Sequence, residues 1–316
     1  MKIGLIDVDG HNFPNLPLMK LSAWHKAKGD TVEWYEPMFS GHLDRVYMSK
    51  VFSFSEDYMY PINANEVVKG GSGYCIHLED GKEVFDKNTD TPLPPPIEHI
   101  YPDYSIYKIT DTAYGFMSRG CPRGCEFCIV GKKEGRKSYK VADLNEFWNG
   151  QPNIEILDPN TLACNEWSDI LEQLARSKAK VNFNQGIDIR LMTEEKAEAI
   201  CEVNTKTIHF AWDRYQDKDT ILPKFEMFRQ KSKMRDRELI VYVLCNYDTT
   251  IDQDLERIYT LRDIGFSPYV MLYNKSSIPK CSQLNSLARW VNNRIVFRTV
   301  DRFEDYDRSL ERKVSV

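Results

Sequence analysis

The chain contains 316 residues, of which 42% are hydrophobic and 12% aromatic, and its formal net charge is −5. This length favours about two domains, because single hydrophobic cores usually stop growing at roughly 250 residues. The composition excludes a disordered chain. The apolar runs are far shorter than the ~20 residues of a bilayer-spanning helix, and Asp7 and Asp9 interrupt the first of them. We therefore expect a soluble, cytoplasmic protein that is neither exported nor bound to a membrane.

The first hundred residues, 1–100, predict a small Rossmann-like α/β domain. A strand-type apolar run at 2–8 is followed by apolar residues at helical spacing from Leu16 to Ala27, and Gly29 supplies a stop signal. Further strands are predicted at 31–35, 51–54 and 66–68. This alternation favours a parallel sheet covered by helices. A stiff proline-rich segment then leads up to Pro102, and we place the domain boundary there.

Residues 101–316 predict six βα units with a C-terminal extension. The predicted strands lie at 113–118, 153–158, 181–186, 207–212, 239–245 and 269–273. Helices are predicted at 168–177 and 193–201, and the strands are spaced widely enough for the crossover helices that parallel pairs require. Residues 294–298 are expected to form one further strand. Six units are too few for the eight-stranded barrel, so we expect a partial (βα)6 barrel with its chemistry at the carboxyl ends of the strands.

Three of the eight cysteines form the pattern CxxxCxxC directly after the first predicted barrel strand. Eight cysteines are too sparse for a disulfide scaffold, so the crowding of Cys121, Cys125 and Cys128 indicates a reducing compartment and a metal site. Three thiolates can hold three irons of a [4Fe-4S] cluster and leave the fourth iron without a protein ligand. The alternatives are a zinc site and three unrelated buried cysteines. A structural zinc site needs a fourth ligand, and no histidine or cysteine follows at the usual spacing.

This loop, with Phe127 before the third cysteine, resembles that of the radical S-adenosylmethionine superfamily, and the resemblance covers about residues 110–275. It implies that the amino and carboxylate groups of S-adenosylmethionine chelate the open iron. One electron from the reduced cluster, supplied by a reductant such as flavodoxin or ferredoxin, then cleaves the sulfonium to methionine and a 5′-deoxyadenosyl radical. That radical usually abstracts a hydrogen from the substrate. The resemblance thus implies an oxygen-sensitive enzyme whose protein part supplies orientation and excludes water.

Residues that hold S-adenosylmethionine are predicted at the ends of the barrel strands. Relatives in this superfamily often carry Gly-Gly-Glu after the second strand, where this chain has Asp158-Pro-Asn160. Alternation places Asn182 and Asn184 on one face of the third strand, which then ends in polar groups. The predicted cofactor-binding residues are Phe127, Asp158, Asn184, Gln185, Asp188 and Asp213. For the polar ones the alternative is a loop cap or a turn former.

Two more cysteines are candidates for catalysis. Cys164 follows the second strand and Cys245 ends the fifth, so we expect both to face the cavity as hydrogen donors, substrate anchors or ligands of a second cluster. The alternative for each is a free buried cysteine. Lysines and arginines cluster at 132–140 and 229–237, which keeps nucleic acid as an alternative partner through phosphate contacts. Solvated loop or helix surfaces explain the same clusters.

The N-terminal domain resembles the cobalamin-binding-type domain of one branch of the superfamily. Residues 70–73 match its glycine-rich loop, where backbone can approach a ligand closely. The Asp-x-His-x-x-Gly pattern of that family is not matched by the segment from Asp7 to His11, so we expect no cobalamin. The substrate stays open among an RNA base, a peptide and a small metabolite, and the presence of only Cys75 argues against methylthiolation. The alternative function is a non-catalytic iron-sulfur or zinc module that senses or binds nucleic acid.

Overall fold

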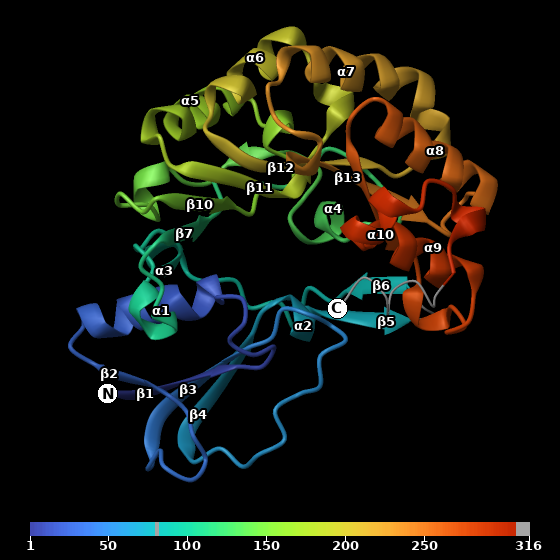
Figure 1. Cartoon of the computed structure of the whole chain (residues 1–316). Helices are drawn as coiled ribbons and strands as arrows, with labels where there is room; N and C mark the ends of the chain where they lie inside the picture. The colour runs from blue at the N-terminus through green and yellow to red at the C-terminus, as the bar shows by residue number, and fades with distance from the viewer. Residues whose placement is uncertain (80–81, 308–316) are drawn as a thin grey trace. The chain divides into compact units, whose positions relative to one another are not determined.

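The computed structural model describes residues 1–79 and 82–307 (Figure 1). Contacts divide the chain into two compact units. The first comprises Met1–Lys137 with Val141–Ile154, and the second comprises Ser138–Lys140 with the residues from Glu155 onward. The proline-rich segment near residue 100 lies inside the first unit, and so do β7 (Thr112–Gly115) and the cysteine loop that follow it.

A four-stranded parallel sheet forms the centre of the first unit. Its strands are β1 (Lys2–Asp7), β2 (Thr31–Trp34), β3 (Leu43–Ser49) and β4 (Ala64–Gly70), in the order β2-β1-β3-β4. Helix α1 (Leu16–Ala27) begins at Asn15, whose side chain accepts a hydrogen bond from Leu18 N, and packs Leu18 and Leu21 against Ile3. The sheet thus buries an apolar face under a helix, as the sequence predicts.

The strand predicted at 51–54 is wrong. Those residues form an exposed loop, and the preceding strand β3, which pairs with β1, ends at Ser49. The carboxylate of Asp9 holds the loop by accepting hydrogen bonds from Val51 N (2.5 Å) and Ser55 Oγ (2.6 Å). An apolar sequence therefore lies on the surface because polar contacts fix its backbone.

The remainder of the first unit consists of short elements. They are α2 (Ser72–Cys75), the antiparallel pair β5 (Ile76–Glu79) and β6 (Lys82–Phe85), α3 (Pro95–Glu98), β7 (Thr112–Gly115), β8 (Ser118–Arg119) and α4 (Val130–Lys133). The three cysteines of the CxxxCxxC pattern lie between β8 and α4.

A six-stranded sheet has the order β14-β13-β12-β11-β10-β7. Its other strands are β10 (Asn153–Ile156), β11 (Lys180–Ile187), β12 (Thr205–Trp212), β13 (Leu239–Cys245) and β14 (Ser267–Leu272). The pairs from β11 to β14 are parallel, which the crossover helices α5 (Trp167–Ser177), α6 (Glu194–Glu202), α7 (Lys218–Lys231) and α8 (Ile251–Asp263) make possible. The predicted mixed α/β class with parallel sheets is confirmed. The closure of this sheet into a partial barrel remains a prediction.

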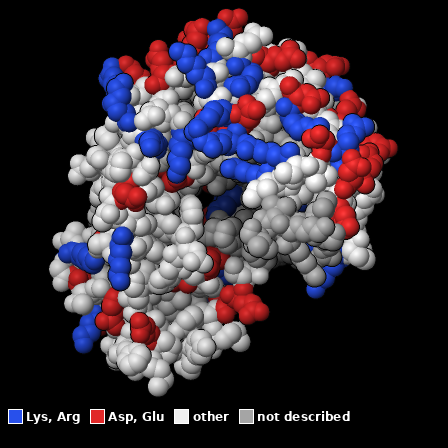
Figure 2. Space-filling view, viewed as in Figure 1, with Lys and Arg blue, Asp and Glu red and all other residues white. Residues whose placement is uncertain are grey.

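The outer face of this sheet is covered by the helices of the second unit, which run along it in Figure 1. Phe210 of β12 packs edge-to-face against Phe225 and Phe228 of α7, with ring centroids 5.7 and 5.2 Å apart. In Figure 2 acidic and basic side chains are interspersed over these outer helices. Among residues 1–79 and 82–307, no helix has the length and hydropathy needed to cross a bilayer.

The strand predicted at 294–298 is also wrong. These residues form helix α10 (Arg294–Thr299), which follows α9 (Gln283–Asn292). Asn293 caps α10 by accepting hydrogen bonds from Ile295 N and Val296 N. Phe297 packs on Trp290 of α9 with ring centroids 4.9 Å apart, so contact with a neighbouring helix overrides the strand preference of this β-branched segment.

Candidate functional site

The three cysteines of the CxxxCxxC pattern share one loop in the first unit, and each is half-buried. Cys128 N donates to the carbonyl oxygen of Cys125 over 3.1 Å, so the last two cysteines lie on a single turn. None of the three is in a disulfide. Phe127, which the sequence predicts to contact the cofactor, stands half-buried in the same turn.

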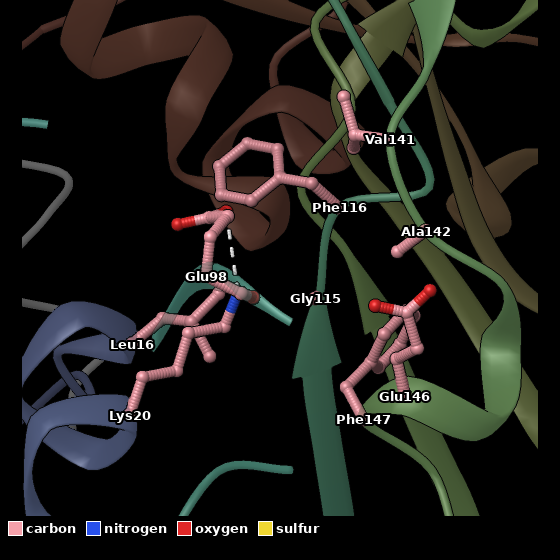
Figure 3. A pocket seen from close by; sticks show the side chains of 9 residues that line it. All are labelled: Leu16, Lys20, Glu98, Gly115, Phe116, Val141, Ala142, Glu146 and Phe147. Atoms are coloured by element: carbon pink, nitrogen blue, oxygen red, sulfur yellow. Dashed lines mark hydrogen bonds and ion pairs between the residues drawn. The ribbon is translucent and has the colours of Figure 1, made fainter. Parts of the chain in front are cut away.

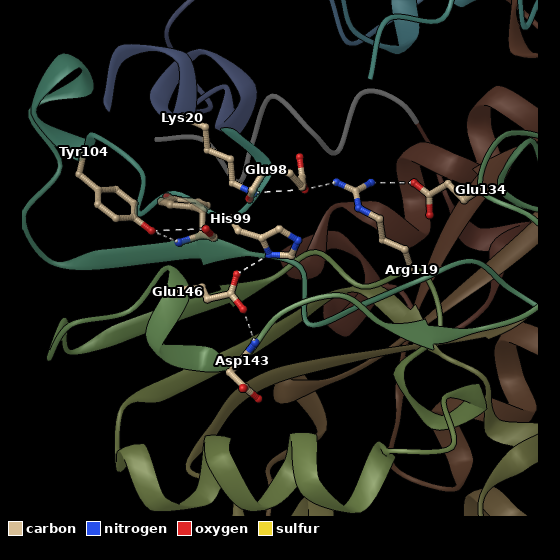
Figure 4. A network of polar contacts seen from close by, with 9 residues as sticks. Lys20, Glu98, His99, Tyr104, Arg119, Glu134, Asp143 and Glu146 are labelled. Carbon is tan, nitrogen blue, oxygen red and sulfur yellow. Dashed lines mark hydrogen bonds and ion pairs between the residues drawn. The ribbon is translucent and has the colours of Figure 1, made fainter. Parts of the chain in front are cut away.

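The two ends of the cysteine loop are held together by what we term the loop clasp, formed by residues 119–121 and 134–137 (Figure 4). The carboxylate of Glu134 accepts hydrogen bonds from Arg119 Nη1 (3.0 Å) and from the buried Gly120 N (3.1 Å). Cys121 N donates to Gly135 O over 3.2 Å. Gly120 has φ +75°, and a Cβ atom there would lie 2.1 Å from Lys137 O, so only glycine permits this closure.

An ion-pair chain extends from the loop clasp to α1 (Figure 4). Arg119 Nη2 lies 3.6 Å from Glu98 Oε1, and Lys20 Nζ lies 3.2 Å from the same oxygen. Burial lowers the pKa of Lys20. Lys20 and Glu98 border the pocket of Figure 3, which Phe116 and Phe147 also line and which has room for about one water molecule. The pocket is therefore a packing gap next to the loop support rather than a ligand site.

Replacing Glu134 by Ala is expected to loosen the loop clasp. The buried amide of Gly120 would lose its acceptor, which costs about 1–3 kcal/mol of the free energy of unfolding. Urea denaturation measures that loss, and the rate of iodoacetamide labelling of Cys121 in the metal-free protein should rise with it. The matched control is Glu79→Ala, whose carboxylate is exposed. Equal labelling rates in both variants would contradict the role of Glu134.

The glycine-rich loop at 70–73 has a structural explanation. Gly71 has φ +96°, and a Cβ atom there would lie 2.3 Å from Lys50 O, while one on Gly73 would lie 2.7 Å from Phe52 O. These glycines thus admit the backbone of a neighbouring segment. Lys133 Nζ of α4 donates to Ser72 Oγ over 2.6 Å, so this loop is joined to the helix that follows the cysteines. The expectation that the domain lacks cobalamin stays a prediction.

In the second unit, the inner face of the six-stranded sheet carries polar and aromatic side chains, and we call this row the polar sheet face. Its members are Glu155 of β10, Asn182 and Asn184 of β11, Thr207 and His209 of β12, Tyr242 of β13 and Tyr269 of β14. Their neighbours along each strand, such as Phe183 and Phe210, are buried on the opposite side. The alternation of side chains along β10, β11 and β12 therefore places their large apolar residues on the helix-covered side of the sheet and the polar residues on the polar sheet face.

Hydrogen bonds interlock the side chains of the polar sheet face. Glu155 Oε2 accepts from Asn182 Nδ2 (2.8 Å) and from Asn184 Nδ2, and Thr207 Oγ1 donates to Asn182 Oδ1. His209 stacks on Tyr242 with ring centroids 5.2 Å apart and an interplanar angle of 15°. The Tyr242 hydroxyl donates to Asn184 O over 3.3 Å.

The carboxyl ends of β11 and β12 carry a second polar group. Asp188 accepts from Arg190 Nε over 2.7 Å, and Arg190 Nη1 lies 3.2 Å from Asp217. Gln185 is exposed. The structure thus holds Asp188 in an ion pair, whereas Asn184 belongs to the polar sheet face. Asp158, after β10, is buried and accepts from Thr161 Oγ1 over 3.2 Å.

Asp213 directly follows β12, and burial raises the pKa of its carboxyl group to about 6, although Arg190 and Arg257 oppose the shift. The folded state then binds a proton that the unfolded state releases near pH 4. The stability of the protein should therefore fall as the pH rises through the window from about 4 to 6.

Asp213→Asn is expected to remove this pH dependence. Below about pH 4 the variant should match the wild type, and well above pH 6 it should be more stable by roughly 3 kcal/mol. Urea denaturation at pH 4, 5, 6 and 7 measures the difference. Asp263→Asn, at an exposed position on α8, serves as the control and should change stability little at any of these values.

The two cysteines predicted to face the cavity are both buried. For Cys245 the prediction is wrong, because it lies on the helix-covered side of β13 with Val243. Burial, together with the charge of Asp254 on α8, raises the pKa of its thiol. Cys164 Sγ donates to Glu166 over 3.0 Å, and burial raises the pKa of the thiol to about 12. Neither thiol is therefore poised to ionise near neutral pH.

The basic segment at 229–237 is largely paired with carboxylates. Lys231 contacts Glu198 over 2.7 Å, and Arg229 contacts Asp236 over 3.1 Å. Within the described residues, no three His, Cys, Asp or Glu side chains gather around a point where a single metal ion would be held. No model of a known protein family matches the chain, and no curated protein matches it.

Sequence reasoning missed Glu155 and Glu134. The segment Asn153-Ile-Glu155-Ile alternates apolar and polar residues, and this signal could have placed Glu155 beside Asn182 and Asn184. Glu134 gives no local signal, because its partners Arg119 and Gly120 lie on the other side of the cysteine loop.

Proposed function

We propose that this protein is a radical S-adenosylmethionine enzyme that binds a [4Fe-4S] cluster through Cys121, Cys125 and Cys128. The observation that carries the proposal is the position of the CxxxCxxC loop. It follows β7, the first strand in chain order of a six-stranded α/β sheet, and polar residues stand at the carboxyl ends of β11 and β12. The carboxyl ends of parallel strands are where such folds bind ligands.

The donor set suits an iron-sulfur cluster better than zinc. A structural zinc site takes four nitrogen or sulfur ligands around one ion. In a four-iron cluster each thiolate binds a different iron, so three thiolates on one loop need not converge on a single point. When bound, the cluster supplies the electron that cleaves the sulfonium of S-adenosylmethionine, and flavodoxin or ferredoxin is the proposed reductant.

The chain's own residues have separate tasks in this proposal. Glu134 and Gly120 close the cysteine loop and fix its position. Asn184, Asp188 and Asp213 supply hydrogen-bond acceptors and donors for the ribose and amino groups of S-adenosylmethionine. The rest of the polar sheet face is left for the substrate.

The test is made on anaerobically reconstituted protein. We expect about four irons and four sulfides per chain, and slow release of 5′-deoxyadenosine and methionine from S-adenosylmethionine under dithionite. Substrate is not needed for this uncoupled cleavage. Bound zinc, or an iron cluster without any cleavage, would refute the proposal and favour a non-catalytic metal-binding module.

A further inference from the structure

The polar sheet face departs from the usual composition of a parallel sheet. Parallel strands flanked by helices are commonly apolar on both sides, because both sides are buried. Here β10, β11 and β12 direct their large apolar side chains toward the helices, whereas Glu155, Asn182, Asn184 and His209 are half-buried on the other side. Such a row contributes little to a hydrophobic core, and a departure of this kind is expected at a functional surface.

Among the described residues, Glu155 Oε1 and His209 Nε2 are acceptors on this face that receive no hydrogen bond. Both amide donors go to Glu155 Oε2. His209 Nδ1 lies 2.8 Å from Phe183 O, an acceptor, so Nδ1 carries the proton and Nε2 of the neutral ring is an acceptor too. Burial lowers the pKa of His209, with Arg294 adding to the shift, and this keeps the ring neutral near pH 7.

The aromatic rings beside His209 offer flat surfaces. His209 and Tyr242 are stacked, and Tyr269 meets Tyr242 edge-to-face with centroids 5.8 Å apart. The side of Tyr269 is open to solvent, with 41% of the residue exposed. Aromatic faces attract cations and stack on planar groups.

From these contacts we infer that the polar sheet face binds a planar group that carries N–H donors and a positive charge, such as an amidine or a protonated amino-substituted heterocycle. Glu155 Oε1 accepts hydrogen bonds from the donors and balances the charge, while the tyrosine rings hold the plane. Calling this ligand the substrate rests on the proposed function; the binding itself does not.

Benzamidine is a suitable probe because it joins an aromatic ring to a forked cationic donor. Its binding to the full-length chain is measured by isothermal titration calorimetry and ligand-observed NMR, with benzoate as the probe of opposite charge. We expect benzamidine to bind and benzoate not to bind. Glu155→Gln should weaken benzamidine at least about tenfold, because it removes a charged acceptor. Glu226→Gln, the same change at an exposed site on α7, should leave binding unchanged.

A second variant keeps the test valid if Glu155→Gln fails to fold. Tyr269→Ala removes a half-exposed ring and should weaken benzamidine about threefold. Absence of benzamidine binding to the wild type, equal binding of benzoate, or unchanged affinity in both variants would overturn the inference. Measurements on metal-free and on reconstituted protein separate the two proposals, because a chain that takes up no iron can still bind benzamidine. If Glu155→Gln instead weakens S-adenosylmethionine and spares benzamidine, the face belongs to the cofactor and the inference is wrong.

Discussion

Replacing any one of Cys121, Cys125 or Cys128 by Ala is expected to reduce the iron content from about four per chain to below one and to abolish 5′-deoxyadenosine release. Each thiolate is the sole protein ligand of its iron in the proposed arrangement, so the loss of one leaves two irons open to solvent. Iron and sulfide analysis after anaerobic reconstitution, together with the visible absorbance of the cluster, measures the effect.

Two other cysteines provide matched controls. Cys201 and Cys281 are exposed, and Ala at either position should leave iron content and cleavage as in the wild type. Cys245→Ala should likewise keep the cluster, since its thiol lies on the helix-covered side of β13. Retention of full iron content in all three loop variants would remove the basis of the proposed function.

Arg257→Met is expected to lower the free energy of unfolding by about 3–5 kcal/mol. Arg257 is fully buried in α8, where Nη2 pairs with Asp254 Oδ1 over 2.5 Å. Its guanidinium also donates to the carbonyl oxygens of Trp212 (2.6 Å) and Leu244 (2.8 Å). Methionine can fill much of the volume, but it leaves Asp254 as a buried charge whose remaining hydrogen bond comes from Thr249. Urea denaturation measures the loss.

The size of this effect depends on burial, so an exposed pair is the control. Arg176 pairs with Glu172 on the surface of α5, and Arg176→Met should cost less than about 1 kcal/mol. The double variant Arg257→Met with Asp254→Leu should regain part of the stability, because it removes the uncompensated charge. A loss below 1 kcal/mol for Arg257→Met alone would show that the buried pair is not needed.

The strands were predictable where packing alone decides them. The segment Leu239–Cys245 is a continuous apolar run, which is typical of a strand buried inside a sheet. β13 has those bounds and lies between β12 and β14. β3 was missed because Asp44 and Arg45 interrupt its pattern at the edge of the apolar cluster. The errors at 51–54 and 294–298 share one cause. In each, a polar side chain, Asp9 or Asn293, holds the backbone of an apolar segment, and at 294–298 the contact of Phe297 with Trp290 adds to it.

The candidate site was predictable in its local parts. The cysteine spacing and the alternation at Asn182 and Asn184 can be read from a few adjacent residues. The acceptor of Gly120 N and the partners of Asp188 cannot, since they depend on which loops meet in the folded chain. The role of the glycines at 70–73 depends in the same way on the segment at 50–52.

The guanidinium of Arg257 has a consequence for the timing of local motion. The guanidinium donates to the carbonyl oxygens of Trp212 and Leu244 and so bridges the carboxyl ends of β12 and β13. When either end opens, it must break its hydrogen bond to this shared side chain. Opening of either strand end is therefore a shared event, and amide hydrogens in the loops after Trp212 and Leu244 should exchange with deuterium at a common rate.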